Sequence, residues 1–183
     1  MNYVNEQDLQ SITSRVDVDL FKGKTVLLIG SNGFLGNWFV DLFNHLKVEY
    51  LAFDPSTNPK HDINNKEALM SLPRYDYVIN CAGIASPEKY MKQPVLTMDI
   101  SYIGTRNVLD YVREKDVESV IMFSSSEVYG TPDPRAIPTK ETYIGAIPTM
   151  GNRSCYDIGK QVLETLCNIY HNELSLIHIS EPT

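Results

Sequence analysis

The stretch TVLLIGSNGFLGNWF, residues 25–39, decides the fold that we expect for this chain. It begins with a run of apolar residues, passes through glycines at positions 30, 33 and 36, and continues with apolar residues at helical spacing. A buried strand that leads through a glycine turn directly into a helix is the usual first unit of an open α/β sheet. The stretch therefore predicts a strand over 25–30 and a helix over about 34–46.

The same alternation of strand and helix continues along the chain. Near-continuous apolar runs lie at 49–54, 77–83 and 119–125, and helical patterns lie at about 65–71, 94–115 and 153–173. Runs that are apolar at successive positions are typical of parallel strands covered on both faces. We therefore expect an α/β fold, a Rossmann-like doubly wound parallel sheet with right-handed crossovers.

The 183 residues are enough for one domain with a sizeable core and too few for two full domains. We expect residues 1–20 to be a polar N-terminal leader that is docked or loose, with a partner-binding element as the alternative. Residues 21–173 form the predicted domain. The ending LSLIHISEPT, 174–183, resembles translated sequencing adapter, which predicts a non-native tail. The apolar pattern of 176–179 would nevertheless allow pairing as a strand.

The composition argues against several classes of function. The net charge is −7, and the acidic residues are scattered along the chain, which disfavours a nucleic-acid surface or attraction to anionic lipid. No apolar run approaches the roughly 20 residues that span a bilayer, and the first ten residues lack the order of a signal peptide. We expect a cytoplasmic protein with neither nucleic acid nor membrane as a partner.

Cysteine spacing and one long segment add two expectations. Cys81, Cys155 and Cys167 lack metal-type spacing and have no clustered histidines beside them, so we expect neither a disulfide framework nor a metal site. Residues 130–152 contain four prolines and no strong periodicity, which predicts a long loop. Such a loop within a compact domain is often functional.

The glycine turn predicts a phosphate-binding site. Gly30 allows the tight turn, Gly33 lets backbone amides approach a pyrophosphate, and Gly36 lets the helix pack against the strand. The helix then presents free N–H groups and its positive dipole end to the anion. The residues between the glycines, Asn32, Phe34 and Leu35, are expected to complete the cofactor site. Packing of strand against helix alone is the alternative.

An acidic residue after the second strand indicates which dinucleotide binds. Asp54 lies eighteen residues beyond Gly36, where a carboxylate can accept hydrogen bonds from ribose hydroxyls and would repel a 2′-phosphate. This favours NAD over NADP, and the alternative is a turn aspartate before Pro55. Asp62 and Ile63 are expected at the end of a third strand, where they would meet the adenine.

A tyrosine and a lysine four residues apart predict the chemistry. Tyr156 and Lys160 lie on one face of a helix, and the ammonium would lower the pKa of the phenol, which yields a general base for a substrate hydroxyl. Ser125 follows the fourth strand at the edge where such sheets bind ligands, so it can hydrogen-bond the reacting oxygen. The combination indicates hydride transfer from a carbinol to NAD. A structural tyrosine with a solvated lysine is the alternative.

These motifs, in order over residues 24–173, resemble the extended short-chain dehydrogenase/reductase superfamily, in the sugar-nucleotide epimerase, dehydratase and decarboxylase group. Three stretches are most similar to the UDP-glucuronate decarboxylase branch: ASPEKYMKQP (85–94), SSSEVYGTP (124–132) and GNRSCYDIGKQVLET (151–165). The resemblance implies oxidation of a nucleotide sugar at C4, loss of CO2 and return of the hydride. It also implies that the chain is truncated at its C-terminus, with the substrate domain largely missing.

The resemblance assigns further residues. It implies that Cys81, Ala82, Gly83 and Thr97 line the NAD site, that Tyr90, Ser125 and Glu127 face the sugar, that Glu127 is catalytic, and that Lys160 holds the nicotinamide ribose. It further implies a homodimer through the helices at about 94–115 and 153–173.

Three positions distinguish the branches. Ser126 stands where 4,6-dehydratases of dTDP-glucose carry an aspartate, whereas Glu127 is compatible with GDP-mannose 4,6-dehydratases and unlike most 4-epimerases. Decarboxylation therefore leads over dehydration and epimerisation. Ser101 replaces an asparagine usual in the family, which puts the normal proton relay in doubt. An NAD-binding module without turnover and a non-catalytic NAD-sensing relative are the alternatives from other classes.

Overall fold

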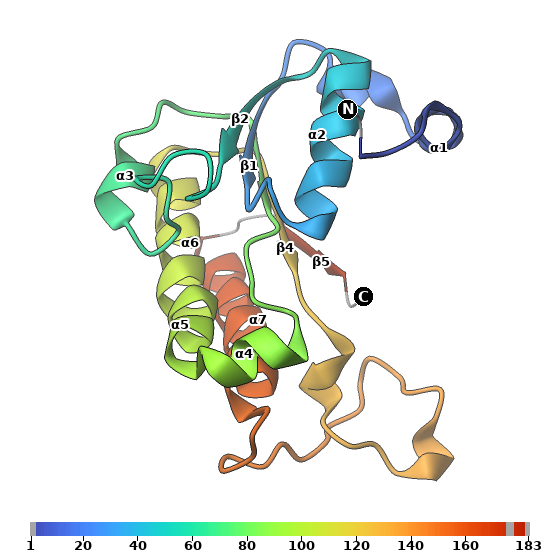
Figure 1. The fold of residues 1–183 in the computed structure, drawn as a ribbon, viewed down its shortest axis with the longest axis vertical. Helices are drawn as coiled ribbons and strands as arrows, with labels where there is room; N and C mark the ends of the chain where they lie inside the picture. The colour runs from blue at the N-terminus through green and yellow to red at the C-terminus, as the bar shows by residue number, and fades with distance from the viewer. Residues whose placement is uncertain (1–2, 175–177, 182–183) are drawn as a thin grey trace.

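The computed structural model describes residues 3–174 and 178–181 and confirms the expected α/β fold. Five parallel strands form one sheet in the order β2-β1-β3-β4-β5 (Figure 1). The strands are β1 (Thr25–Ile29), β2 (Glu49–Phe53), β3 (Tyr77–Asn80), β4 (Ser119–Phe123) and β5 (His178–Glu181). The chain order reverses between β1 and β3, and doubly wound sheets bind ligands at such a switch point.

Alternate residues of β1 pack on opposite faces of the sheet, which explains why the strand is apolar at every position from 26 to 29. Leu27 and Ile29 belong to one core cluster and Val26 and Leu28 to the other, and all four are at most 1% exposed. A side-chain period of two places neighbours on opposite faces. Since both faces of β1 carry a core, helices must cover both.

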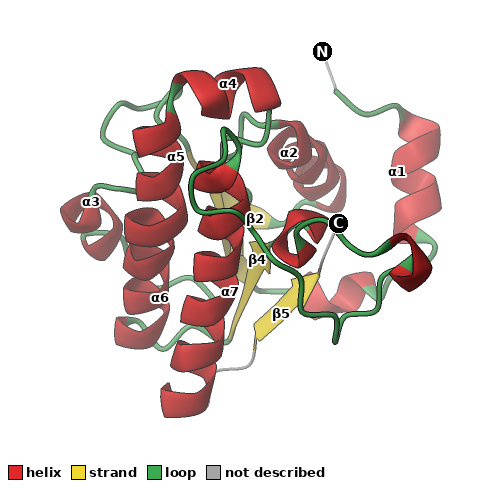
Figure 2. Cartoon of the chain, turned by 90° about the horizontal axis from the view of Figure 1, so that it is seen from below, coloured by secondary structure: helices red, strands yellow, loops and turns green. Residues whose placement is uncertain are grey.

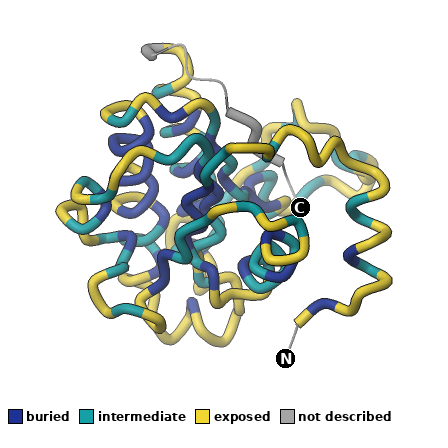
Figure 3. Tube along the Cα trace, turned by 90° about the horizontal axis from the view of Figure 1, so that it is seen from above, coloured by how far each residue is buried: buried dark blue, intermediate teal, exposed yellow. Residues whose placement is uncertain are grey.

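The helices form two layers, as Figure 2 shows. On one face lies α2 (Phe34–Leu46), with α1 (Glu6–Thr13) beyond it; on the other lie α3 (Lys66–Met70), α4 (Pro87–Lys92), α5 (Pro94–Asp99), α6 (Thr105–Glu114) and α7 (Ser154–Leu174). Buried positions concentrate in the strands and inner helices (Figure 3). No described helix is long and apolar enough to cross a membrane.

The predicted helix over 94–115 is interrupted by a π-helical turn. Between α5 and α6, residues Ile100–Gly104 (η2) form the wider turn, and the Ser101 hydroxyl donates to the Thr97 carbonyl at 2.9 Å. A Cβ at Gly104 would lie 2.9 Å from Ile63. Such turns frequently occur at functional sites, and this one faces the switch point.

Helix α4 was not predicted, although its sequence carries a start signal. Ser86 occupies the N-cap position and Pro87 the first turn, and proline is favoured there because its missing N–H has no helical partner anyway. Six residues are too few to show helical periodicity. Only the N-cap and the proline that follows it could have predicted this helix from the sequence.

The expected third strand ending at Asp62 and Ile63 is wrong. Residues 58–65 form turns instead, in which His61 donates its N–H to the Asn58 carbonyl and Asn65 to the Asp62 carbonyl, both at 2.8 Å. Turn-forming asparagines and a proline supply local hydrogen bonds that compete with a strand ladder. The sheet consequently ends at β2 on this side.

The N-terminal residues dock on α2. Asn5 caps α1, the Val4 N–H donates to the buried Asp41 carboxylate at 2.7 Å, and Leu9 is 1% exposed. These contacts tie residues 4–9 to the domain.

Two short 3-10 helices, η3 (Ser126–Tyr129) and η4 (Pro134–Ala136), lie between β4 and α7, and η1 (Val18–Phe21) precedes β1. The rest of 130–152 is the predicted long loop without regular structure.

At the C-terminus, β5 pairs with β4 from Val120 opposite His178 to Phe123 opposite Glu181. Positions 178 and 179 of the expected strand lie within β5, and positions 176 and 177 lie outside the described residues.

Candidate active site

One groove crosses the carboxyl edge of the sheet at the switch point. It consists of two adjoining pockets that share Cys81, Ala82, Gly83, Ile84 and Ile100. Gly30, Gly33 and Asp54 lie at one end, and Tyr156 and Lys160 at the other. An elongated ligand could therefore contact the glycine turn and the tyrosine–lysine pair together.

The three glycines of the turn serve different purposes. Gly30 has φ +76°, and a Cβ there would lie 2.6 Å from the Ala82 nitrogen, while a Cβ at Gly36 would lie 2.2 Å from the Gly30 carbonyl oxygen. Both positions therefore require glycine for backbone packing. A Cβ at Gly33 meets only the Gly30 oxygen at 3.3 Å, and this residue lines the groove. This contact with backbone is tight for a Cβ, so backbone packing and the approach of a ligand both favour glycine at 33.

The start of α2 fits a phosphate group. The first intrahelical donor is the Asn37 N–H, which bonds the Gly33 carbonyl at 3.0 Å, so the N–H groups of Phe34, Leu35 and Gly36 have no helical acceptor. The Ser31 hydroxyl is buried beside the turn, and no partner for it exists among the described residues. Free amides and a buried hydroxyl suit an anion at a helix N-terminus.

Asp54 lies in the groove and also stabilises its own turn. It is 8% exposed and accepts hydrogen bonds from the Asn32 N–H at 3.2 Å and the Ser56 N–H at 2.9 Å. Burial alone would raise the pKa of Asp54, but hydrogen bonds from Ser56 and Asn32 outweigh it and hold the pKa below its usual value. The residue therefore presents a carboxylate to the groove, and the turn interpretation holds as well.

Beyond Asp54 the groove is closed by residues from the segment after β2. Ile63 is 5% exposed and lines it, held by a hydrogen bond from the Asn107 amide to its carbonyl at 3.0 Å. Asp62 does not line it, because its carboxylate accepts the Asn64 N–H at 2.9 Å. His61, which was not predicted, lines the groove and stacks on Phe53 with centroids 4.6 Å apart.

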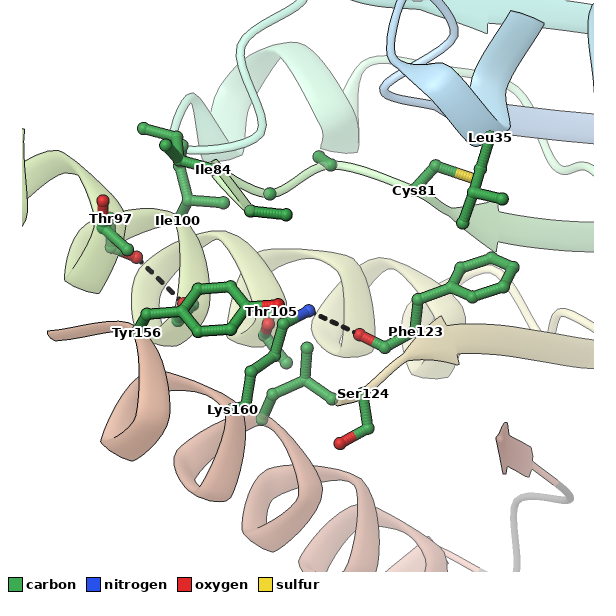
Figure 4. Close-up of a pocket in the computed structure, with 15 residues that line it drawn as sticks. Leu35, Cys81, Ile84, Thr97, Ile100, Thr105, Phe123, Ser124, Tyr156 and Lys160 are labelled. Atoms are coloured by element: carbon green, nitrogen blue, oxygen red, sulfur yellow. Dashed lines mark hydrogen bonds between the residues drawn. The ribbon is translucent and has the colours of Figure 1, made fainter. Parts of the chain in front are cut away.

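At the other end, Tyr156 and Lys160 project from α7 into the groove (Figure 4). Lys160 is 8% exposed, and its Nζ donates to the Phe123 carbonyl at 2.6 Å and lies 5.8 Å from the Tyr156 ring centroid. Burial lowers the pKa of Lys160 to about 8, although the charges of Glu164 and Cys81 oppose this. Burial raises the pKa of the Cys81 thiol to about 12. A buried lysine with a lowered pKa thus lies beside the phenol.

Helices α2, α5 and η2 complete this end of the groove. Leu35 reaches it from α2, and Thr97 and Ser101 reach it from the opposite layer. Ser101 therefore occupies the position near Tyr156 at which the family's asparagine was expected. Ser124 also lines the groove and donates a hydrogen bond to Glu164. The sequence analysis did not single out Ser124, because it assigned the hydrogen bond to the reacting oxygen to the neighbouring Ser125.

Several predicted residues do not line the groove. Asn32 donates its side-chain amide to Ser56, Phe34 is 68% exposed and packs edge-on against Tyr3, and Gly36 lies beneath the turn. Ser125 is buried, and its hydroxyl accepts the Glu127 N–H at 3.3 Å as the cap of η3. These positions shape the turn and the strand end rather than the groove surface.

Tyr90 is placed against the predicted base. Its ring stacks on Tyr156 with centroids 5.0 Å apart and an interplanar angle of 14°. It is 1% exposed, and its hydroxyl has no partner among the described residues. Tyr90 is thus covered in this structure, although the resemblance implied that it faces the sugar.

Glu127 lies in a separate cavity next to the groove. Its carboxylate forms an ion pair with Arg153 at 2.7 Å, and Asp157 lines the same cavity. The structure therefore places the predicted acidic residue beside the start of α7, the helix whose first turn contains Tyr156.

A groove at the switch point of a parallel sheet, with a glycine turn at one end and a Tyr-x-x-x-Lys pair at the other, defines the dinucleotide-binding Rossmann class. The sequence adds the family: residues 26–179 match the NAD dependent epimerase/dehydratase family, and the chain belongs to it.

Relatives by sequence include UDP-glucuronic acid decarboxylase 1 of Arabidopsis thaliana, 33% identical over 175 residues that cover 87% of this chain and 39% of the relative. The enzyme of the same description from Danio rerio is 32% identical over 80% of this chain and 38% of the relative. These matches confirm the group that the motifs predicted. The chain spans well under half the length of either relative.

Solved structures show the same fold. A UDP-glucose 4-epimerase of Thermotoga maritima, solved with UDP-glucose, superposes with a TM-score of 0.74 at 23% identity over 85% of this chain and 54% of that one. The UDP-glucose 4-epimerase of Brucella ovis, in complex with NAD, gives 0.72 at 21% identity over 86% of this chain and 50% of that one.

Proposed function

We propose that this chain is the NAD-binding part of an enzyme that transiently oxidises a nucleotide sugar at C4. The observation that carries the proposal is the single groove that joins the glycine turn and Asp54 to Tyr156 and Lys160. The turn binds the pyrophosphate, and Asp54 accepts hydrogen bonds from the ribose hydroxyls. Cys81, Ala82 and Gly83 line the groove between its two ends. NAD supplies the hydride acceptor when it is bound.

The protein's own residues handle the proton. Tyr156 takes the proton of the C4 hydroxyl, and Lys160 stabilises the phenolate and hydrogen-bonds the nicotinamide ribose. The hydrogen bond from Nζ to the Phe123 carbonyl holds the Lys160 side chain within the groove, where it can serve both the phenolate and the ribose. Ser125 orients the reacting oxygen, which requires its hydroxyl to turn from the Glu127 N–H.

The full-length protein is most simply a UDP-glucuronate decarboxylase. Support comes from the relatives of that description and from Glu127 at the strand end, where an acidic residue is expected for this branch. A nucleotide-sugar 4,6-dehydratase or 4-epimerase is the alternative within the family. A different class is also compatible with the short chain: a module that binds NAD without turnover.

Two measurements separate these functions. NAD should raise the melting temperature of the chain more than NADP does, because the Asp54 carboxylate repels a 2′-phosphate. Chromatography of UDP-glucuronate incubations then detects turnover. Tyr156→Phe should retain the NAD shift and lose any turnover. No shift with NAD would sink the proposal, and a shift without turnover would support the binding module.

We further propose a homodimer through the helices at about 94–115 and 153–173, which the structure divides into α5, η2, α6 and α7. Exposed apolar side chains on these helices include Val95, Tyr102, Ile103 and Ile169, of which Val95 is 73% exposed. Apolar side chains grouped on neighbouring helices commonly mark an interface. The cytoplasmic location remains a prediction from the sequence.

A further inference from the structure

The turns after β2 bring His61 back onto the end of that strand. The Asn58 N–H donates to the Asp54 carbonyl at 3.1 Å, and the His61 N–H donates to the Asn58 carbonyl at 2.8 Å. These turns reverse the chain, and the imidazole stacks on Phe53 with ring centroids 4.6 Å apart and an interplanar angle of 12°. Because Phe53 is the last residue of β2, His61 lies at the same end of the groove as Asp54.

Both nitrogens of this imidazole are withheld from the groove. The Asn58 amide nitrogen lies 3.2 Å from Nε2, and the Lys60 N–H donates to the Asn58 amide oxygen at 3.1 Å, which fixes the amide with its NH2 group toward the ring. Nε2 is therefore the acceptor, and the neutral ring carries its proton on Nδ1. Nδ1 is buried and has no hydrogen-bond partner among the described residues. The part of His61 that lines the groove is therefore its carbon surface.

The surroundings of His61 suit a flat apolar ring with a ribose next to it. Phe53 is 0% exposed, Ile63 is 5% exposed, and both line this end of the groove together with Pro55. Among the described residues that line the same pocket, only Asp54 carries a charge. An aromatic base between the apolar side chains would leave its ribose hydroxyls to that carboxylate.

We propose that His61 is the adenine-binding residue of the groove and that the base stacks on its ring. Phe53 covers one face of the imidazole, so the opposite face is the one that a base can cover. A base that stacks on an aromatic side chain gains a factor of at least about five in affinity. The proposal rests on the proposed function, because the base is the adenine of NAD. His61 thereby takes the place beside the base that was expected of Asp62.

The first test is NMR of the histidine ring protons with and without ADP-ribose. This probe carries the adenosine and the pyrophosphate but no nicotinamide, so the result is independent of catalysis. A base that stacks on a ring moves the Cε1–H and Cδ2–H signals upfield, whereas a base bound in the plane of the ring moves them downfield. We expect upfield shifts for His61, whose signals are identified by their loss in His61→Phe. His45, which pairs with Glu6 at the end of α2, should show none.

Calorimetric titration with ADP-ribose tests the same contact by affinity. His61→Phe keeps a ring that can stack and should bind within about twofold of the wild type. His61→Leu has no aromatic face and should bind at least about fivefold more weakly. His45→Leu is the matched control and should bind like the wild type.

Three results would overturn the proposal: no upfield shift of the His61 signals, unchanged affinity in His61→Leu, or equal losses in His61→Phe and His61→Leu. The last would indicate a hydrogen bond from Nδ1 instead of stacking. Should His61→Leu unfold, the ring-proton shifts and the affinity of His61→Phe still decide. Failure of both NAD and ADP-ribose to bind would sink the proposed function and this proposal with it, whereas binding without these effects overturns this proposal alone.

Discussion

Lys160 combines burial with a charge, which makes the stability of the protein depend on pH. Its folded-state pKa of about 8 lies below the ordinary value of 10.5 because burial penalises the ammonium. Between these two values the unfolded chain binds more protons than the folded chain. The free energy of unfolding therefore rises with pH over this window, and the penalty is fully present below pH 8.

Lys160→Met should remove this dependence. At pH 7 we expect the variant to be more stable than the wild type by up to about 3 kcal/mol, reduced by about 1 kcal/mol for the lost hydrogen bond to the Phe123 carbonyl. The difference should shrink as pH rises from 8 to 10.5. Urea unfolding at several pH values measures it, and a constant difference across that range would contradict the burial argument.

The sequence could predict some site residues and not others, for a physical reason. Gly30 and Asp54 follow from spacing along the consecutive β1, α2 and β2 segments, and Tyr156 and Lys160 from spacing along one helix, so short-range geometry determines them. Arg153 and its pairing with Glu127 depend on how the long loop returns to α7, over more than twenty residues. No local periodicity specifies such a contact.

At the scale of elements, two glycines with positive φ offer a comparison: Gly23, which precedes β1, and Gly30, which follows it. Gly30→Ala should destabilise the protein strongly, because the left-handed conformation costs about 1–2 kcal/mol and the new Cβ lies 2.6 Å from the Ala82 backbone. Gly23→Ala should show the conformational cost alone, since Gly23 has φ +71° and nothing within 4 Å of a Cβ. Denaturant unfolding compares the two, and equal losses would contradict the packing role of Gly30.

The contact between η2 and α7 depends on another glycine. Alanine is favoured over glycine by about 1 kcal/mol inside a helix, yet a Cβ at Gly159 would lie 2.7 Å from the Ser101 hydroxyl and 3.0 Å from its Cβ. Overpacking costs about 1–3 kcal/mol, so Gly159→Ala should be destabilising.

Adding Ser101→Ala to this variant should restore part of the loss, because it removes the closer of the two contacts. A double-mutant cycle by thermal unfolding gives the coupling. If Gly159→Ala stabilised the protein, the close approach of these helices would be refuted.

Most elements were predictable because their patterns are long. The strands β1 to β4 and the helices α2 and α7 carry continuous apolar or helical patterns over many residues. Helix α4 is too short to show helical periodicity. The strand that we expected to end at 61–63 was wrong because the hydrophobic pattern takes no account of the turn-forming residues around it. The π-turn within 100–104 depends on tertiary packing against Ile63 and α7, which no local rule contains.

For the whole molecule, the proposed homodimer makes a prediction with a matched control. Ile103 on η2 is 40% exposed beside Tyr102, whereas Ile144 in the long loop is 95% exposed. Burying an aliphatic side chain contributes about 1.5–3 kcal/mol, and a charge in its place costs more because it must be desolvated. Ile103→Glu should therefore shift the chain to monomer, and Ile144→Glu should not.

Sedimentation equilibrium over a range of concentrations measures both variants against the wild type. A wild type that stays monomeric throughout, or equal dissociation by the two variants, would exclude the helical face as the interface. Since η2 and α7 also carry Ser101, Tyr156 and Lys160, a dimer would hold together the two elements between which the groove is formed. Dissociation by Ile103→Glu should accordingly reduce the thermal shift produced by NAD, whereas Ile144→Glu should retain it.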